Sequence, residues 1–88
     1  MIRILIADDH SIVRRGLKEI LLEEFPDATI SEVSDGSELL REARAGSWTI
    51  IISDISMPGR NGIEILKQLK EEFPKLPVLI LSMHAENH

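Results

Sequence analysis

The sequence predicts an α/β protein built on a doubly wound parallel sheet. Short apolar runs rich in β-branched residues alternate with stretches of helical spacing, and the connections between them are short. Because each crossover between parallel strands returns over the sheet with a right-handed turn, helices are expected on both faces. In such a sheet, functional groups lie just beyond the carboxyl ends of the strands, near the point where the strand order reverses.

Four runs have the character of strands. Residues 2–7, 50–53 and 78–81 are almost continuously apolar, as strands buried on both faces of a parallel sheet are. Residues 28–33 place Ile and Val among polar neighbours, which favours a strand nearer the sheet edge.

Three stretches between these strands predict helices. The first covers residues 11–25 and ends before Pro26. The second covers residues 36–45, with Ser37 as its expected N-cap and Gly46 at its end, and the third covers residues 61–73. The apolar positions expected to face the sheet are Ile12, Val13, Leu17, Ile20, Leu21, Leu22, Leu39, Leu40, Ala43, Ile65, Leu66, Leu69 and Phe73.

The composition narrows the classes of function. Eighty-eight residues make one domain at most, and 43% hydrophobic with 28% charged residues is typical of a soluble globular protein. The chain has no cysteine, which excludes thiolate chemistry and fits a reducing cytoplasm. A formal net charge of -5 argues against direct binding to nucleic acid or to an anionic membrane. The apolar start of the chain is too short for a signal peptide or a membrane span.

Three carboxylates follow two of the predicted strands. The first strand ends at Asp8 and Asp9, and the third ends at Asp54. In a parallel sheet with these strands adjacent, the three groups share one rim and repel one another unless a cation neutralises them. Oxygen ligands of this kind suit Mg²⁺ or Mn²⁺, and a carboxylate beside such an ion can attack phosphorus to form an aspartyl phosphate. Taken without Asp54, the adjacent pair would equally suit a solvated helix start.

Two serines are candidates for the same rim. Ser56 lies in a Pro/Gly/Asn-rich turn after Asp54 and offers a main-chain carbonyl as a metal ligand. Ser82 follows the fourth strand, where its hydroxyl would reach a phosphoryl oxygen. Taken alone, a serine at a strand end is more often a simple turn residue.

Histidine and arginine side chains near the rim receive no site role from the sequence. His10 is left out of the site, because a histidine at a helix start is more often solvated or a packing contact. His84 and His88 are expected to bind metal only adventitiously. Arg14 and Arg15 are expected on the helix surface, where they would help to dock a partner kinase.

The combined motifs resemble the receiver domain of two-component response regulators, of which CheY is an example. They are Asp8-Asp9 after a first strand, Asp54 followed by Met57-Pro58 and Asn61-Gly62, and Ser82 after a fourth strand. The segments DDHSIVRRGL and DISMPGRNGIE further resemble the NarL/FixJ group, whose members usually join a receiver to a helix-turn-helix DNA-binding domain.

The resemblance implies a flavodoxin-like sheet with strand order 2-1-3-4 and a role as a signalling switch rather than an enzyme. It implies that Asp54 is the phosphoacceptor, Asp9 a direct metal ligand and Asp8 a direct or water-mediated one. It also makes Ser82 the switch hydroxyl. The implied partners are a sensor histidine kinase and a covalently linked output domain that controls transcription.

The resemblance also predicts that residues 1–88 are a receiver domain that is incomplete at its C-terminus. A complete receiver continues through a helix, a fifth strand ending in a lysine, and a final helix. Lys75 precedes the fourth strand and does not replace that lysine. Without the fifth strand, the fourth becomes an unpaired edge, so we expect either that the missing part is disordered or cleaved, or that a second chain covers the gap by dimerisation or strand exchange.

Two other classes of function use a similar fold. A Mg²⁺-dependent phosphohydrolase of the haloacid dehalogenase type also has an aspartate nucleophile, but carries it in a D-x-D motif, whereas Asp8 and Asp9 are adjacent. A flavodoxin-like nucleotide-binding module needs a neutral loop to hold phosphate after the first strand. Two aspartates in that loop would repel the nucleotide.

Overall fold

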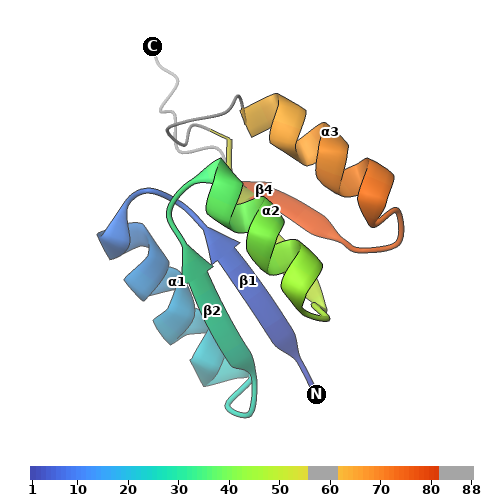
Figure 1. The fold of residues 1–88 in the computed structure, drawn as a ribbon. Helices are drawn as coiled ribbons and strands as arrows, with labels where there is room; N and C mark the ends of the chain where they lie inside the picture. Colours follow the sequence, from blue (N-terminus) through green and yellow to red (C-terminus); the bar gives the residue numbers. More distant parts are fainter. Residues whose placement is uncertain (56–61, 82–88) are drawn as a thin grey trace.

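The computed structural model describes residues 1–55 and 62–81, which form four strands and three helices in strict alternation (Figure 1). The predicted element types are all found, and no end differs from the prediction by more than one residue. The bounds are β1 Arg3–Ala7, α1 Ser11–Glu24, β2 Thr29–Val33, α2 Gly36–Ala45, β3 Ile50–Asp54, α3 Gly62–Glu72 and β4 Val78–Leu81.

The strands form one parallel sheet in the order β2-β1-β3-β4, which confirms the predicted topology. β1 and β3 are the two inner strands. Their pairing aligns Ala7 with Ser53, so both strands end at the same edge of the sheet. The chain therefore brings the residues that follow these two strands to one rim.

The two faces of the sheet are covered unequally. α2 and α3 lie over one face and α1 over the other (Figure 1). On the α2 and α3 face, both strand and helix side chains are buried, and the cluster consists of Leu5, Ala7, Val33, Leu39, Leu40, Ala43, Ile51, Ile65 and Leu69. On the α1 face, the buried cluster holds only the strand residues Ile4, Ile6 and Ile52, against which helix residues Leu17 and Leu21 pack while partly exposed.

The prediction of the buried face of α1 was wrong for two residues. Ile12 and Ile20 are 83% and 59% exposed, and no residue of α1 is fully buried. The apolar stripe of this helix is wider than the side that contacts the sheet. Only the positions centred on Leu17 and Leu21 therefore lose most of their contact with water.

The N-cap of α2 also differs from the prediction. Asp35, not Ser37, caps the helix: its backbone is extended, and its carboxylate accepts from the main-chain N–H of Glu38 at 2.8 Å. Glu38 in turn accepts from the N–H of Ser34 at 2.9 Å, so two N–H groups at this end are satisfied by carboxylates. Ser37 lies within the first turn of the helix.

β4 is an edge strand among the described residues, since it pairs there with β3 alone. Its side chains Leu79 and Ile80 are 52% and 49% exposed, so the expectation of burial on both faces was wrong for this strand. None of the helices in residues 1–55 and 62–81 has the length and apolarity that crossing a membrane requires.

Candidate functional site

Asp8, Asp9 and Asp54 meet at the rim formed by the carboxyl ends of β1 and β3. Asp8 and Asp54 are 0% and 3% exposed, whereas Asp9 lies at the surface. One ligand atom from each of these residues, together with one from His10, lies within 4.8 Å of the others. The predicted convergence of the three carboxylates is therefore present, and it also includes a histidine.

Asp8 has two oxygens in different situations. Its Oδ1 accepts from the main-chain N–H of His10 at 2.8 Å and lies 2.7 Å from His10 Nδ1. Its buried Oδ2 has no hydrogen-bond partner among the described residues. Burying a carboxylate oxygen without a partner costs free energy, and a bound cation would remove that cost. Asp8 thus fits a metal site better than it fits a closed hydrogen-bond network.

His10 is the residue that sequence reasoning left out of the site. Its ring Nδ1 lies 2.7 Å from Asp8 Oδ1 and 3.0 Å from Asp9 Oδ1. The hydrogen bond to Asp8 raises the pKa of His10, and the negative charges of Asp9, Asp8 and Asp54 raise this pKa further, against a smaller opposing effect of burial. Its position directly after two aspartates was the available signal, but sequence alone did not show that the ring turns back toward them.

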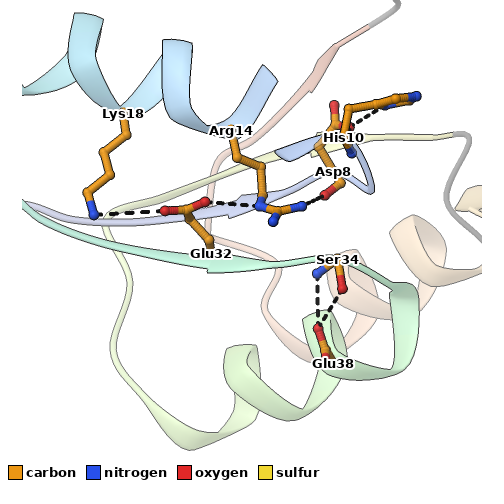
Figure 2. A network of polar contacts seen from close by, with 7 residues as sticks. All are labelled: Asp8, His10, Arg14, Lys18, Glu32, Ser34 and Glu38. Carbon is orange, nitrogen blue, oxygen red and sulfur yellow. Dashed lines mark hydrogen bonds and ion pairs between the residues drawn. The ribbon is translucent and has the colours of Figure 1, made fainter. Parts of the chain in front are cut away.

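Arg14 supports the site from α1, contrary to its predicted role as helix surface. Its Nη1 donates to the main-chain carbonyl of Asp8 at 2.6 Å, and its Nε donates to Glu32 Oε1 on β2 at 2.9 Å (Figure 2). Lys18 Nζ lies 3.8 Å from the other oxygen of Glu32. The neighbouring Arg15 is exposed, as predicted.

Gly62 fixes the approach of α3 to the end of β3. A Cβ atom at this position would overlap the main-chain carbonyl of Ile55, the residue directly after Asp54. Only a residue without a side chain permits so close a contact between the two backbone segments. The Asn61-Gly62 pair noted in the sequence thus has a steric reason for its glycine.

The two predicted serines lie outside the described residues. The metal-ligand role of the Ser56 carbonyl and the switch role of the Ser82 hydroxyl therefore stay predictions. A hollow of about 390 Å³ lies at the opposite end of the sheet, lined by Met1, Ile2 and residues 24–28, and does not belong to the acidic rim.

Comparison with known proteins identifies the family. Residues 4–88 match the family described as the response regulator receiver domain. The chain belongs to the receiver-domain family. A receiver domain is a signalling domain of two-component systems, and the curated relatives are regulators of the NarL/FixJ group.

Two curated relatives illustrate the match. The receiver domain is 43% identical over 88 residues to the transcriptional regulatory protein LiaR of Bacillus subtilis, covering 99% of this chain and 41% of LiaR. It is 31% identical over 87 residues to the response regulator UvrY of Escherichia coli O6:H1, covering 99% of this chain and 40% of UvrY. The chain thus spans about two fifths of the length of these relatives.

Solved structures agree with the overall fold. The response regulator TrrA of Thermotoga maritima, solved in complex with Mg²⁺ and BeF, superposes with a TM-score of 0.88 at 32% identity, covering 97% of this chain and 72% of that one. A chain of the crystal structure of histidine kinase ThkA in complex with TrrA gives a TM-score of 0.85 at 31% identity, covering all of this chain and 76% of that one.

Proposed function

We propose that this receiver domain is a phosphoacceptor switch, in which Asp54 takes a phosphoryl group from a sensor histidine kinase with the help of Mg²⁺. The observation that carries the proposal is the convergence of Asp8, Asp9 and Asp54, with ligand atoms within 4.8 Å, around a buried Asp8 oxygen without a hydrogen-bond partner among the described residues.

The donor set fits a hard divalent cation. Asp8, Asp9 and Asp54 offer carboxylate oxygens, and the Ser56 carbonyl is proposed as a further oxygen ligand. Mn²⁺ shares this preference and is the alternative ion. When bound, the cation supplies positive charge against the negative oxygens of the phosphoryl group. TrrA, the neighbour solved with Mg²⁺ and BeF, supports this assignment.

Asp54 is proposed as the acceptor because it ends β3 at the acidic rim and matches the phosphoacceptor position of the receiver-domain motif. Asp8 Oδ1 has two nitrogen neighbours from His10, and Asp9 Oδ1 lies 3.0 Å from the same ring. In the transfer, an oxygen of Asp54 forms a bond to phosphorus, the phosphorus–nitrogen bond of the kinase phosphohistidine breaks, and the released ring nitrogen takes a proton from water. Ser82 is proposed to contact the phosphoryl group afterwards and carry the change onward.

The partners are proposed from the relatives. The ThkA–TrrA complex supports a histidine kinase as the phosphodonor, and LiaR, a transcriptional regulatory protein, supports an output domain that controls transcription. Residues 1–88 would then be the receiver portion of a longer cytoplasmic regulator, in which a helix-turn-helix domain contacts DNA.

Phosphorylation with a small phosphodonor tests the proposal. The full-length protein that contains this chain is incubated with acetyl phosphate and Mg²⁺, and its intact mass is measured. We expect one phosphoryl group on the wild type, none on Asp54→Asn and none after chelation of Mg²⁺. Asp27→Asn, which removes an exposed carboxylate, serves as the matched control and should be labelled like the wild type. Labelling of Asp54→Asn, or steady turnover of a phosphoester, would contradict the switch and favour the phosphohydrolase.

A further inference from the structure

The distances between potential ligand atoms around His10 resemble those between neighbouring ligands of an octahedral metal ion. In an octahedral ion with bonds of about 2.0–2.1 Å, neighbouring ligand atoms are separated by about 2.8–3.0 Å. His10 Nδ1 lies 2.7 Å from Asp8 Oδ1 and 3.0 Å from Asp9 Oδ1. The distances from His10 Nδ1 to one oxygen of each aspartate are therefore already close to the separations that one ion requires.

A second observation points to a ligand at this place. Asp8 is fully buried, and its Oδ2 has no hydrogen-bond partner among the described residues. The main-chain N–H of His10 donates to the other oxygen of the same carboxylate, so His10 and Asp8 are held in one turn. The His10 side chain itself is 59% exposed, which leaves the ring accessible to an ion arriving from solvent.

Imidazole changes which ions such a site prefers. Carboxylate and carbonyl oxygens suit Mg²⁺, whereas imidazole nitrogen suits Zn²⁺, Cu²⁺, Fe²⁺ and Ni²⁺. Binding at Nδ1 requires that this nitrogen carry no proton, and the ion would then take the place of the contacts between His10 and the two carboxylates. The same rim would then hold Mg²⁺ through oxygen ligands and a transition-metal ion through oxygen and nitrogen ligands together.

We propose that His10 is a metal ligand that selects for transition-metal ions, so that the cation site of this receiver domain binds Ni²⁺ or Zn²⁺ through the His10 ring in addition to Asp8 and Asp9. This inference rests on the proposed cation site and adds to it a ligand and an ion class.

Ion binding to matched histidine variants tests the inference. Because His84 and His88 would also bind Ni²⁺, the parent protein carries His84→Asn and His88→Asn, and His10→Asn is added to it. Asparagine is a favourable N-cap, and His10 occupies the N-cap position of α1, so the fold is expected to persist. Calorimetry measures the binding of Ni²⁺ alone and of Mg²⁺ alone at one fixed pH.

We expect His10→Asn to weaken Ni²⁺ binding about tenfold or more, a loss typical of perturbed metal sites, and to change Mg²⁺ binding less than about threefold. In the parent, Zn²⁺ should shift the ¹⁵N resonance of His10 Nδ1. Unchanged Ni²⁺ binding, or equal weakening of both ions, would overturn the inference. Neither result bears on the proposed function, which is tested separately by the phosphorylation of Asp54 in the presence of Mg²⁺.

Discussion

Nη1 of Arg14 donates to the main-chain carbonyl of Asp8 at 2.6 Å, from the first turns of α1 to the end of β1. Glu32 on β2 holds the same guanidinium through Nε at 2.9 Å, so the arginine is tied at two points and only 18% exposed. The hydrogen bond from Arg14 thereby restrains the peptide group between Asp8 and Asp9. We therefore expect the orientation of the two carboxylates to depend on Arg14.

Replacing Arg14 by glutamine is expected to weaken Mg²⁺ binding about threefold to tenfold, which corresponds to about 0.7–1.4 kcal/mol. Loss of the Arg14 charge and loss of its hydrogen bond to Asp8 are expected to change the affinity for Mg²⁺ in opposite directions. Removal of a nearby positive charge alone would strengthen binding of a cation, so weakening would report the lost support of the Asp8 carbonyl. Calorimetric titration with Mg²⁺ gives the dissociation constant.

Arg15→Gln is the matched control, because it removes the same charge from an exposed neighbouring position. It should leave Mg²⁺ binding unchanged or slightly stronger. Arg14→Lys keeps the charge but loses the forked geometry and should behave like Arg14→Gln. Tighter Mg²⁺ binding by Arg14→Gln would refute the positioning role.

Glu72 on α3 should titrate far below an ordinary glutamate. Arg44 on α2 donates to it at 2.8 Å and 2.5 Å, and these hydrogen bonds, with a smaller one from Gln68, lower the pKa of Glu72 from 4.5 to about 2. Since the folded-state pKa is lowered, the pair stabilises the fold above about pH 4.5, and this contribution is lost as the pH falls toward 2.

An NMR titration of the Glu72 side-chain carboxyl checks this value. In Arg44→Gln the pKa of Glu72 should return toward 4.5. In Arg41→Gln, which removes an exposed arginine from the same helix, the pKa should stay low. A normal pKa for Glu72 in the wild type would show that the α2–α3 ion pair does not form in solution.

Replacing either of two glycines by alanine should change the free energy of unfolding, but in opposite directions. At Gly36, an added Cβ would lie 3.0 Å and 3.2 Å from two carbons of the buried Ile65, so Gly36→Ala should destabilise the fold by about 1–3 kcal/mol. At Gly16, within α1, an added Cβ meets nothing within 4 Å, so Gly16→Ala should stabilise by about 0.4–1 kcal/mol. Urea denaturation of both variants measures the free energy of unfolding, and equal effects would contradict the packing described for α2 and α3.

Gly62→Ala is expected to reduce phosphorylation of Asp54 severely. Its Cβ would overlap the carbonyl of Ile55, so the backbone directly after Asp54 must move. Labelling by acetyl phosphate, measured by intact mass, should fall well below that of the wild type, while Gly16→Ala should be labelled normally. Normal labelling of Gly62→Ala would mean that the contact between these backbone segments does not position Asp54.

Sequence patterns were sufficient to predict the sheet and the convergence of the carboxylates at its rim. The apolar runs predicted each strand found in residues 1–55 and 62–81, and the parallel topology then placed Asp8 and Asp54 at the same rim without any knowledge of side-chain positions. This worked because the ends of adjacent parallel strands are fixed by backbone pairing, which residue type and spacing predict well.

Features that depend on side-chain direction were not predictable in this way. Asp35 and Ser37 are both capping residues two positions apart, and only the backbone conformation decides which one caps α2. His10 and Arg14 received roles only once the structure showed their ring and guanidinium turned toward Asp8. The exposure of Ile12 depends on what covers α1, and helical spacing does not contain that information.

The central place of β1 in the sheet has a consequence for the order of assembly. The two strands that pair with β1 are separated from it along the chain by at least one complete helix. Arg3 pairs with Thr29, and Ile4 pairs with Ile50. During synthesis β1 therefore leaves the ribosome before either of the strands that pair with it. We expect the nascent chain to expose this segment until β3 has emerged, and folding to be limited by closing these long loops rather than by forming helices.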